Sequence, residues 1–408
     1  MSRGWVVTLA ALGINLALGI LYTWSVISKA IPTDWNWTEQ QKSWPYAIAC
    51  LVFSIMMVPA GRLQDRISPR WVATFGGVLV GLGMMLASRG NSYWNYMLGF
   101  GVLAGTGIGF GYASATPPAV KWFPAARTGM IAGIVVSGFG LASVYAAPLT
   151  NWLVKQEGGV PGAMFTLGIA FLLVVTGLAQ LLRTPPKGYV PTGTIPAAPG
   201  AVAKKENFSP TEMLCTSQFY LLWFMYACGA GAGLMIIAKL AVIADKQAGV
   251  ALGFVLVASL AVGNGAGRII AGMVSDKLGR KPTIMGCLLF QAVLMIVLTL
   301  ATKGSPLAAV PVMAVLSALM GANYGANLAL YPSVTKDYYG LKNFGVNYGL
   351  VFTSWGLGGF ALSLVAGKLY DTYQNFTYAC YLAAGLLVLA AFMALLLHPP
   401  RVQSLPET

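Results

Sequence analysis

Charged side chains are scarce in this chain. Only 9% of its 408 residues are Asp, Glu, Lys or Arg, whereas hydrophobic residues make up 57%. A soluble domain averages about 25% charged residues, so this chain has too few to cover a water-facing surface. A mean hydropathy of +0.72 agrees with that conclusion. We therefore expect an integral membrane protein that lies in a lipid bilayer.

Acidic side chains are rarer still, because 11 Asp and Glu stand against 25 Lys and Arg, a net charge of +14. Such a balance also occurs in nucleic-acid-binding proteins. Here, however, the basic residues sit in short loops between apolar stretches, which is a membrane topology signal. We therefore expect no nucleic-acid partner. The acidic residues all lie in or beside loops: Asp34, Glu39, Asp65, Glu157, Glu206, Glu212, Asp245, Asp276, Asp337, Asp371 and Glu407.

Residues that carry most enzyme chemistry are also few. The single histidine, His398, follows the last apolar stretch, which excludes a histidine-based active site inside the bundle. The five cysteines show no metal-ligand spacing, and four of them lie inside apolar stretches, so we expect free thiols. No pairing of a nucleophile with a base appears. We expect no enzyme, no cofactor and no metal site.

Long apolar runs, by contrast, are abundant. Twelve can be counted, each long enough to span a bilayer as a helix, at roughly 5–30, 45–63, 71–88, 94–119, 129–153, 163–182, 218–243, 250–275, 282–301, 307–331, 344–367 and 374–397. Residues 183–217 are rich in Pro, Ala, Gly, Thr and Lys and show no helical period. This linker separates six apolar runs from six others.

The distribution of basic residues predicts the orientation. With both termini in the cytoplasm, 16 Lys and Arg fall on the cytoplasmic side and 8 on the other. This two-to-one bias favours that orientation, and we expect an inner (plasma) membrane location. The first run follows Arg3 without a small-residue cleavage site, so we expect a retained helix and not a signal peptide.

One charge lies inside an apolar run. Between Lys246 and Asp276 the only ionised side chain is Arg268. At about 1.5 Å per residue it lies roughly 12 Å inside the boundary at Asp276, near the middle of a roughly 30 Å hydrocarbon layer. Such a charge is costly unless it faces a partner, a cavity or a ligand. Carbonyls and buried water could satisfy it, but the absence of acidic residues from the apolar runs favours a fixed cation that binds an anionic substrate.

Other polar residues share helical faces with or near this charge. Asn264 lies four residues before Arg268 and therefore on the same face. In the tenth run, Tyr324, Asn327 and Tyr331 follow one stripe. Two further tyrosines, Tyr22 and Tyr112, lie in the first and fourth runs. Aromatic residues are common in membrane helices, so each tyrosine can equally be core; together with a guanidinium, hydroxyl donors suit a small carboxylate.

An internal repeat supports the two halves. The loop after the second run reads GRLQDRISPR, from Gly61, and the loop after the eighth reads GMVSDKLGRK, from Gly272. Its glycine would allow close helix approach, and its aspartate can pair across helix ends. The second copy resembles the loop signature of the major facilitator superfamily; the first departs from it at Ser68 and Pro69.

That resemblance covers the whole chain and implies an all-α fold of twelve transmembrane helices in two pseudo-symmetric six-helix bundles, with the binding site between them. The implied domains are an N-terminal bundle at residues 1–183, a cytoplasmic linker at 184–217 and a C-terminal bundle at 218–408.

A finer resemblance is to the oxalate–formate antiporter and monocarboxylate transporter families. It rests on Tyr22-Thr23-Trp24-Ser25, Lys121-Trp122-Phe123-Pro124, Asn264-Gly265-Ala266-Gly267-Arg268 and Asn347-Tyr348-Gly349. In those families the eighth-helix arginine binds the substrate carboxylate, and it matches Arg268. Their aromatic site positions match Tyr112 and Tyr324. The chain is similar to a bacterial homologue of the lactate-carrying members.

Three positions differ from these families. Where the oxalate carrier has a second cation in the eleventh helix, this chain has Trp355. Where animal monocarboxylate transporters have an aspartate four residues before the arginine, it has Asn264. Lys29 resembles their first-helix lysine but lies out of register, so it is either a coupling residue or a snorkelling lysine.

Together with this resemblance, the sequence predicts a secondary transporter of small monocarboxylates such as L-lactate that works by alternating access, and the resemblance also implies proton symport. Arg268 would anchor the carboxylate, and Asn264, Tyr112 and Tyr324 would orient it. Apolar walls that include Trp355 would select a short hydrocarbon tail, and Asn327 and Tyr22 complete the expected site. The alternatives are an organic-anion antiporter of the oxalate–formate type and, in another class, an anion sensor that kept the carrier fold without transport.

Overall fold

The structure is a computed structural model that describes residues 2–124, 127–156, 158–186, 188–189, 208–340 and 343–400; nothing is described of the side chains of Asp65, Thr128 and Gly129. Most of the predicted linker, residues 190–207, lies outside the described residues. The predicted domain boundaries at 183 and 218 therefore stay predictions. We use "N-half" for the helices before this gap and "C-half" for those after it.

Helices account for the architecture, and the described residues contain no strand. Within the described ranges, twelve helical stretches are long and apolar enough to cross a membrane, which confirms the predicted fold class. The N-half contains α1 (Arg3–Leu18), η1 (Gly19–Thr23), α2 (Trp24–Ala30), η2 (Thr33–Trp35), α3 (Glu39–Arg66), α4 (Pro69–Ala87), α5 (Tyr93–Tyr96), the π-helical η3 (Met97–Ala104), α6 (Gly105–Val120), α7 (Thr128–Leu153) and α8 (Gly159–Ala179).

The C-half has the same number of spans. It contains α9 (Pro210–Leu214), α10 (Ser217–Lys246), α11 (Gly253–Leu278), α12 (Arg280–Thr299), η5 (Pro306–Ala308), α13 (Val310–Tyr339), α14 (Phe344–Tyr373), α15 (Thr377–Met393) and η6 (Ala394–Leu396). Its central helix is α10, because 94% of the apolar window of α10 is buried against 67% or less in every other span.

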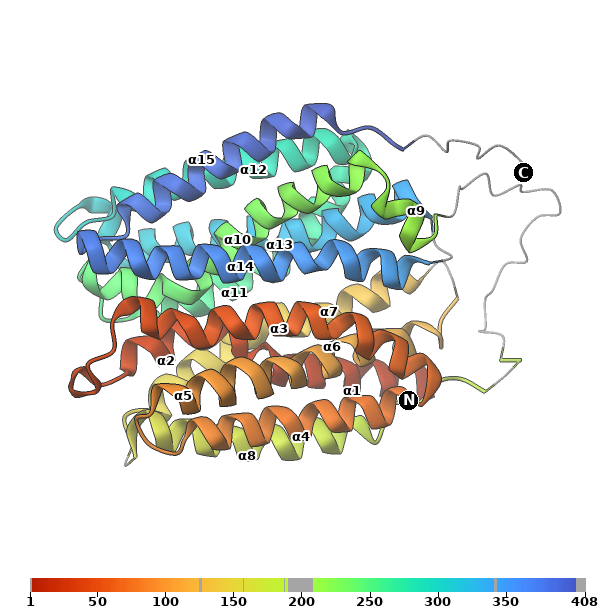
Figure 1. The fold of residues 1–408 in the computed structure, drawn as a ribbon, viewed down its shortest axis with the longest axis horizontal. Helices are drawn as coiled ribbons and strands as arrows, with labels where there is room; N and C mark the ends of the chain where they lie inside the picture. Colours follow the sequence, from red (N-terminus) through yellow and green to blue (C-terminus); the bar gives the residue numbers. More distant parts are fainter. Residues whose placement is uncertain are drawn as a thin grey trace.

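The two halves lie side by side as two layers of helices (Figure 1). The contact between them is formed by α3 against α14, α7 against α11, and α2 against α10. The N-terminus and α9 lie at one end of the layers, here named the terminal face, and α2 ends at the opposite end, the distal face. Hydrogen bonds between described residues of the two halves occur at the distal face and halfway along the helices.

Several helices are longer than their apolar runs. The second span begins at Glu39, six residues before the predicted start at 45, because Thr38 and Gln41 form a capping box that holds a polar first turn. In the C-half, α13 continues to Tyr339 and α14 to Tyr373, also beyond their apolar runs. The apolar run therefore marks the membrane-crossing part of each helix, and polar turns extend it at both faces.

The first span is not a continuous α-helix. Its middle is the 3₁₀ turn η1, which carries Tyr22. At the start of this turn, Gly19 lies so close to α7 that a Cβ there would be 2.6 Å from the backbone oxygen of Phe139. Only a residue without a side chain allows this approach, and it brings Tyr22 to the centre of the molecule.

Glycines also fix the contact between α11 and α13. A Cβ at Gly263 would lie 1.8 Å from the backbone oxygen of Ala318, and one at Gly267 would lie 2.0 Å from that of Ala322. From the other helix, Gly321 and Gly325 approach the α11 backbone equally closely. Small residues spaced four apart on both helices permit this backbone contact, which positions the helix turn that carries Arg268.

The repeated loop behaves partly as predicted. Asp276 pairs with Arg280 across the junction of α11 and α12, at 2.7 Å, and Arg280 also reaches Asp337 on α13, at 3.0 Å. Gly279 between them has a φ of +92°, which favours glycine. The expectation that the first glycine allows close helix approach is wrong for this structure, because a Cβ at Gly272 would meet no atom within 4 Å.

We predict that Gly263→Ala destabilises the protein. Overpacking typically costs about 1–3 kcal/mol, and here the new methyl group would meet a backbone carbonyl that cannot rotate away. The measurement is the thermal unfolding temperature in detergent. Gly272→Ala is the matched control, because it lies on the same helix with open space around it. Equal unfolding temperatures for the two variants would contradict the tight α11–α13 contact.

Candidate functional site between the two halves

Arg268 lies on α11 where α11 meets α7 of the N-half. Its guanidinium donates from Nη1 to the backbone oxygen of Val136, at 3.0 Å, and from Nε to Oδ1 of Asn264, at 3.2 Å. The side chain is partly buried, and none of the ion pairs among the described residues includes it. Carbonyl and amide oxygens thus hold the guanidinium, and its positive charge lacks a carboxylate in the described part of the chain.

Asn264 orients the guanidinium from one helix turn away. Its side chain is fully buried, and its Nδ2 group has no hydrogen-bond partner. On the α7 side stands Gly140, where a Cβ would lie 3.1 Å from Nη2 of Arg268 and 3.3 Å from Nδ2 of Asn264. The glycine leaves room for two polar groups that face the N-half. An unsatisfied buried donor of this kind is costly and marks a place where an acceptor can bind.

Tyrosine hydroxyls surround the same position. Tyr22, Tyr112 and Tyr348 all lie close enough to Arg268 to interact with it electrostatically. Their rings belong to an aromatic wall in which Phe139 makes edge contacts with Tyr22 and Tyr112, at centroid distances of 4.9 and 5.3 Å. The arrangement is a cation with neutral donors on an apolar wall, which is the chemistry that a small organic anion requires.

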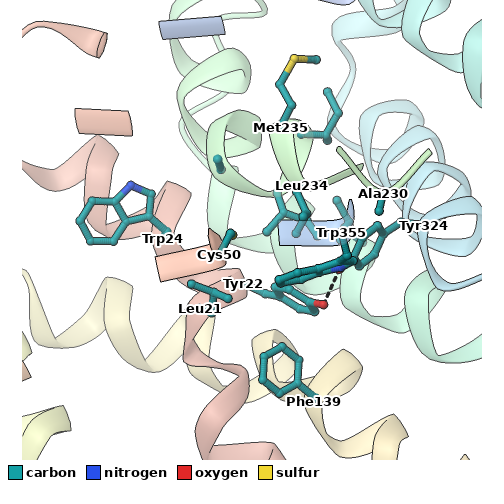
Figure 2. Packing of buried hydrophobic residues seen from close by; sticks show 14 of the residues in the cluster. Leu21, Tyr22, Trp24, Cys50, Phe139, Ala230, Leu234, Met235, Tyr324 and Trp355 are labelled. Atoms are coloured by element: carbon teal, nitrogen blue, oxygen red, sulfur yellow. Dashed lines mark hydrogen bonds between the residues drawn. The ribbon is translucent and has the colours of Figure 1, made fainter. Parts of the chain in front are cut away.

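A second group of polar contacts, which includes Tyr22, crosses between the halves (Figure 2). The hydroxyl groups of Tyr22 and Tyr324 form a hydrogen bond of 2.5 Å, and the indole Nε1 of Trp355 donates to Tyr324 at 2.8 Å. Tyr22 comes from the N-half, whereas Tyr324 and Trp355 come from the C-half. Trp355 is fully buried and stacks on Phe352, so apolar surface fills the position that a second cation would occupy by the family resemblance.

The structure does not bring every predicted site residue to Arg268. Asn327 is buried inside the C-half, where its amide donates to the backbone oxygen of Asn323 and its Oδ1 lies against Gly229 of α10. The predicted stripe on α13 does exist, because Tyr324 packs on Gly233 and Tyr331 stacks on Tyr226. That stripe faces α10, and only its distal member, Tyr324, reaches the N-half.

Lys29 lies at the distal face and not beside Arg268. Its ammonium forms an ion pair with Asp245 of α10, at 2.9 Å, and donates to the backbone oxygen of Ala251, at 3.1 Å. Both partners belong to the C-half, so this lysine connects the halves. A coupling role for Lys29 stays a prediction.

Hydropathy and charge counts gave no sign of a second buried cation, Lys239. It lies within the apolar run 218–243. In the structure its side chain is 1% exposed and pairs with Glu39, which is 4% exposed. Its position four residues inside the end of the run was the available signal. Glu39 lies beside a loop in the sequence, as predicted for the acidic residues, but its carboxylate is buried.

Comparisons with known proteins agree with this architecture. A family model described as Major Facilitator Superfamily matches residues 7–259 and 247–408. The chain is 28% identical over 356 residues to the uncharacterized MFS-type transporter YhjX of Escherichia coli, covering 87% of this chain and 85% of that protein. It is 27% identical over 356 residues to the oxalate:formate antiporter of Oxalobacter formigenes, covering 86% and 81%.

A human relative and a solved structure extend the comparison. The chain is 27% identical over 396 residues to monocarboxylate transporter 11 of Homo sapiens, covering 95% of this chain and 81% of that protein. A bacterial homologue of the human lysosomal transporter Spinster, solved in an inward-facing and unoccupied conformation, superposes with a TM-score of 0.71 at 16% identity over 97% of both chains. The structural likeness concerns the fold.

Proposed function

The chain belongs to the major facilitator superfamily and is a multi-pass membrane transporter, and we propose that it carries small monocarboxylates such as L-lactate by alternating access. The observation that carries this proposal is the environment of Arg268. Its guanidinium lies between the halves, held by neutral oxygens, beside a buried amide donor without a partner. One carboxylate would neutralise the charge and accept from that donor.

The remaining site residues have distinct roles in this proposal. Arg268 anchors the carboxylate, and Asn264 orients the guanidinium and donates to the substrate. Tyr112 and Tyr22 offer hydroxyl groups from the N-half, while Tyr324 is held in place by its hydrogen bonds to Tyr22 and Trp355. Since substrate contacts come from both halves, binding can drive one half toward the other, which is what alternating access requires.

Two alternatives remain in the proposal. The similarity to an oxalate:formate antiporter favours organic-anion exchange. Against a dicarboxylate stands Trp355, because the second carboxylate would be left desolvated without a cation, at a cost of several kcal/mol. An anion sensor without transport would bind the substrate but show no flux in proteoliposomes, so uptake by purified, reconstituted protein separates that class from a carrier.

We predict that Arg268→Ala abolishes transport and that Arg268→Lys does not restore it fully. Truncating one member of a buried charged pair costs about 2–5 kcal/mol, or roughly 30-fold or more in affinity, and an ammonium cannot reproduce the two-pronged donation of a guanidinium. The measurements are lactate binding and uptake by purified protein. Arg89→Ala is the control, because Arg89 is exposed at the distal face. Near-normal binding and uptake in Arg268→Ala would refute the anchor.

We also predict that wild-type protein discriminates against oxalate, and that Trp355→Lys raises oxalate binding while weakening lactate transport. The new ammonium would pair with the second carboxylate, but it would repel Arg268 and lose the hydrogen bond to Tyr324. Binding is therefore a better measure than flux. Trp355→Phe keeps the aromatic wall and serves as the control that gains no oxalate affinity. Equal affinities of the wild type for lactate and oxalate would place the antiporter ahead of this proposal.

Proton coupling is the third prediction for this function. We expect an inward proton gradient to drive uptake and a protonophore to abolish it, because a proton would travel inward with the substrate. The measurement is lactate uptake into proteoliposomes at two external pH values, with and without the protonophore. Uptake that ignores the gradient but depends on a carboxylate preloaded inside would identify an exchanger.

A further inference from the structure

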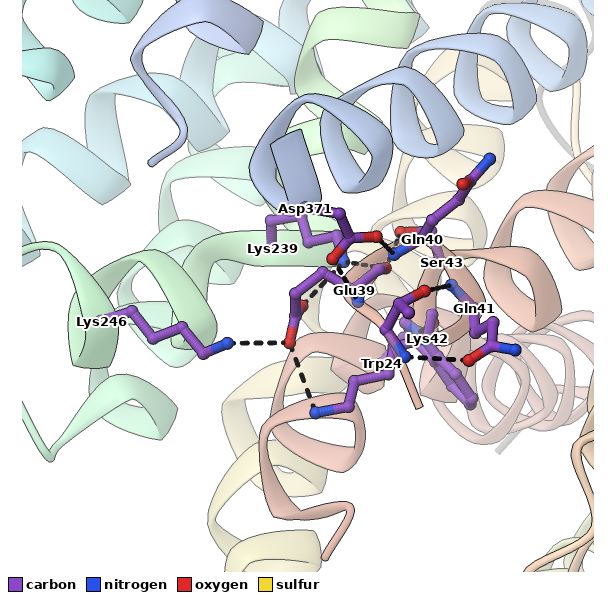
Figure 3. Close-up of polar contacts among 10 residues, drawn as sticks. Trp24, Glu39, Gln40, Gln41, Lys42, Ser43, Lys239, Lys246 and Asp371 are labelled. Carbon is purple, nitrogen blue, oxygen red and sulfur yellow. Dashed lines mark hydrogen bonds and ion pairs between the residues drawn. The ribbon is translucent and has the colours of Figure 1, made fainter. Parts of the chain in front are cut away.

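The distal face contains a carboxylate held by three lysines (Figure 3). Oε1 of Glu39 pairs with Lys246 at 3.1 Å and with Lys42 at 3.3 Å, and Oε2 pairs with Lys239 at 3.2 Å. Lys239 donates a second hydrogen bond, of 3.0 Å, to the backbone oxygen of Glu39. Buried ions require partners of this quality, because removing charges from water is expensive.

The members of this cluster belong to different halves. Glu39 and Lys42 lie in the first turn of α3, whereas Lys239 and Lys246 lie on α10. Each of the two ammonium groups on α10 contacts a different oxygen of the Glu39 carboxylate. The C-half therefore contributes two cations that bind a carboxylate, and the N-half contributes that carboxylate as the side chain of Glu39.

Alternating access would require the distal face to open, and opening would separate Glu39 from Lys239 and Lys246. Glu39 moves away with Lys42 beside it, and Lys239 loses both of the hydrogen bonds described above. In this structure Lys246 lies over the ring of Tyr370, at 4.5 Å, and both residues belong to the C-half. Opening would expose two ammonium groups of one helix, α10, which hold a carboxylate in the structure described.

We propose that Lys239 and Lys246 form an outer binding site for the substrate carboxylate, which Glu39 occupies when the distal face is closed. This inference rests on the proposed monocarboxylate transport. A transported monocarboxylate presents the same group as the Glu39 side chain, so the two exclude one another from the site.

A second carboxylate, that of Asp371, belongs to the same cluster. Asp371, on α14 of the C-half, accepts hydrogen bonds of 2.9 Å from the backbone N–H groups of Glu39 and Gln40 at the start of α3. When the face opens, Asp371 stays on the C-half near Lys239, with which it interacts electrostatically. Opening also separates Lys29 of the N-half from Asp245 of the C-half, so two aspartates accompany the two lysines on the open face.

Mutual exclusion also orders the transport cycle. While substrate occupies the two lysines, Glu39 cannot return, and the distal face stays open. Movement of the substrate inward to Arg268 frees the lysines for Glu39, and the face closes behind the substrate. The outer site thereby couples closure to the departure of the substrate from the entrance.

The test is the KM of L-lactate uptake from the distal side in intact cells that lack other lactate carriers. Glu39→Gln removes the carboxylate that competes with the substrate for the two lysines, and it therefore lowers the KM several-fold. Lys239→Gln and Lys246→Gln remove a site cation and raise the KM about tenfold. If the cluster were merely a clasp between the halves, all three variants would loosen the same contact and move the KM in the same direction.

The control is Asp245→Asn, which removes the partner of Lys29 and so weakens the same face without touching either site lysine; its KM does not rise. Lys246 is 38% exposed, so Lys246→Gln keeps the test valid if Lys239→Gln fails to fold. KM shifts of the same sign in Glu39→Gln and Lys246→Gln overturn the outer site but leave monocarboxylate transport intact. Absence of monocarboxylate uptake by the wild type refutes the proposed function, and the outer site with it.

Discussion

An uncompensated positive charge halfway along a membrane helix is the constraint on which this structure depends. A guanidinium in that position is costly unless polar groups surround it, and Arg268 receives a backbone carbonyl from α7, an amide from its own helix and tyrosine hydroxyls nearby. Each of these groups stabilises the charge without neutralising it. The helices that meet here must therefore bring polar atoms to the interface, which explains the glycines that let α7 and α13 approach α11 so closely.

The distal face also contains a buried cation, but there the charge is neutralised by a carboxylate. There Lys239 is as deeply buried as any core residue, yet it is fully paired with a carboxylate from the other half. At the distal face, paired charges join the two halves. At the centre, the charge of Arg268 has no carboxylate partner among the described residues. We propose that this difference in charge pairing distinguishes a contact between the halves from the proposed binding site; both contain a cation between the same two layers of helices.

Hydropathy and spacing predicted much of this arrangement. Twelve apolar runs gave twelve spans, and the spacing of Asn264 and Arg268 placed both on one face, because these properties are local. The ion pair between Glu39 and Lys239 joins residues 200 positions apart, and no local pattern reports such a pairing. Asn327 shows a second limit, since a helix buried on several sides has more than one polar stripe. Helix periodicity groups residues on a face, but tertiary packing decides what the face meets.

The glycine contact between α11 and α13 makes the C-half the rigid component of the site. The backbones of these two helices touch at four glycines, so the helices cannot slide past one another. The distance between Arg268 on α11 and Tyr324 on α13 is therefore fixed. The N-half contributes Tyr22 and Val136 from outside that unit. A small molecule bound at this place would therefore meet C-half residues held at a fixed separation, while the N-half would add Tyr22, Tyr112 and the backbone carbonyl of Val136.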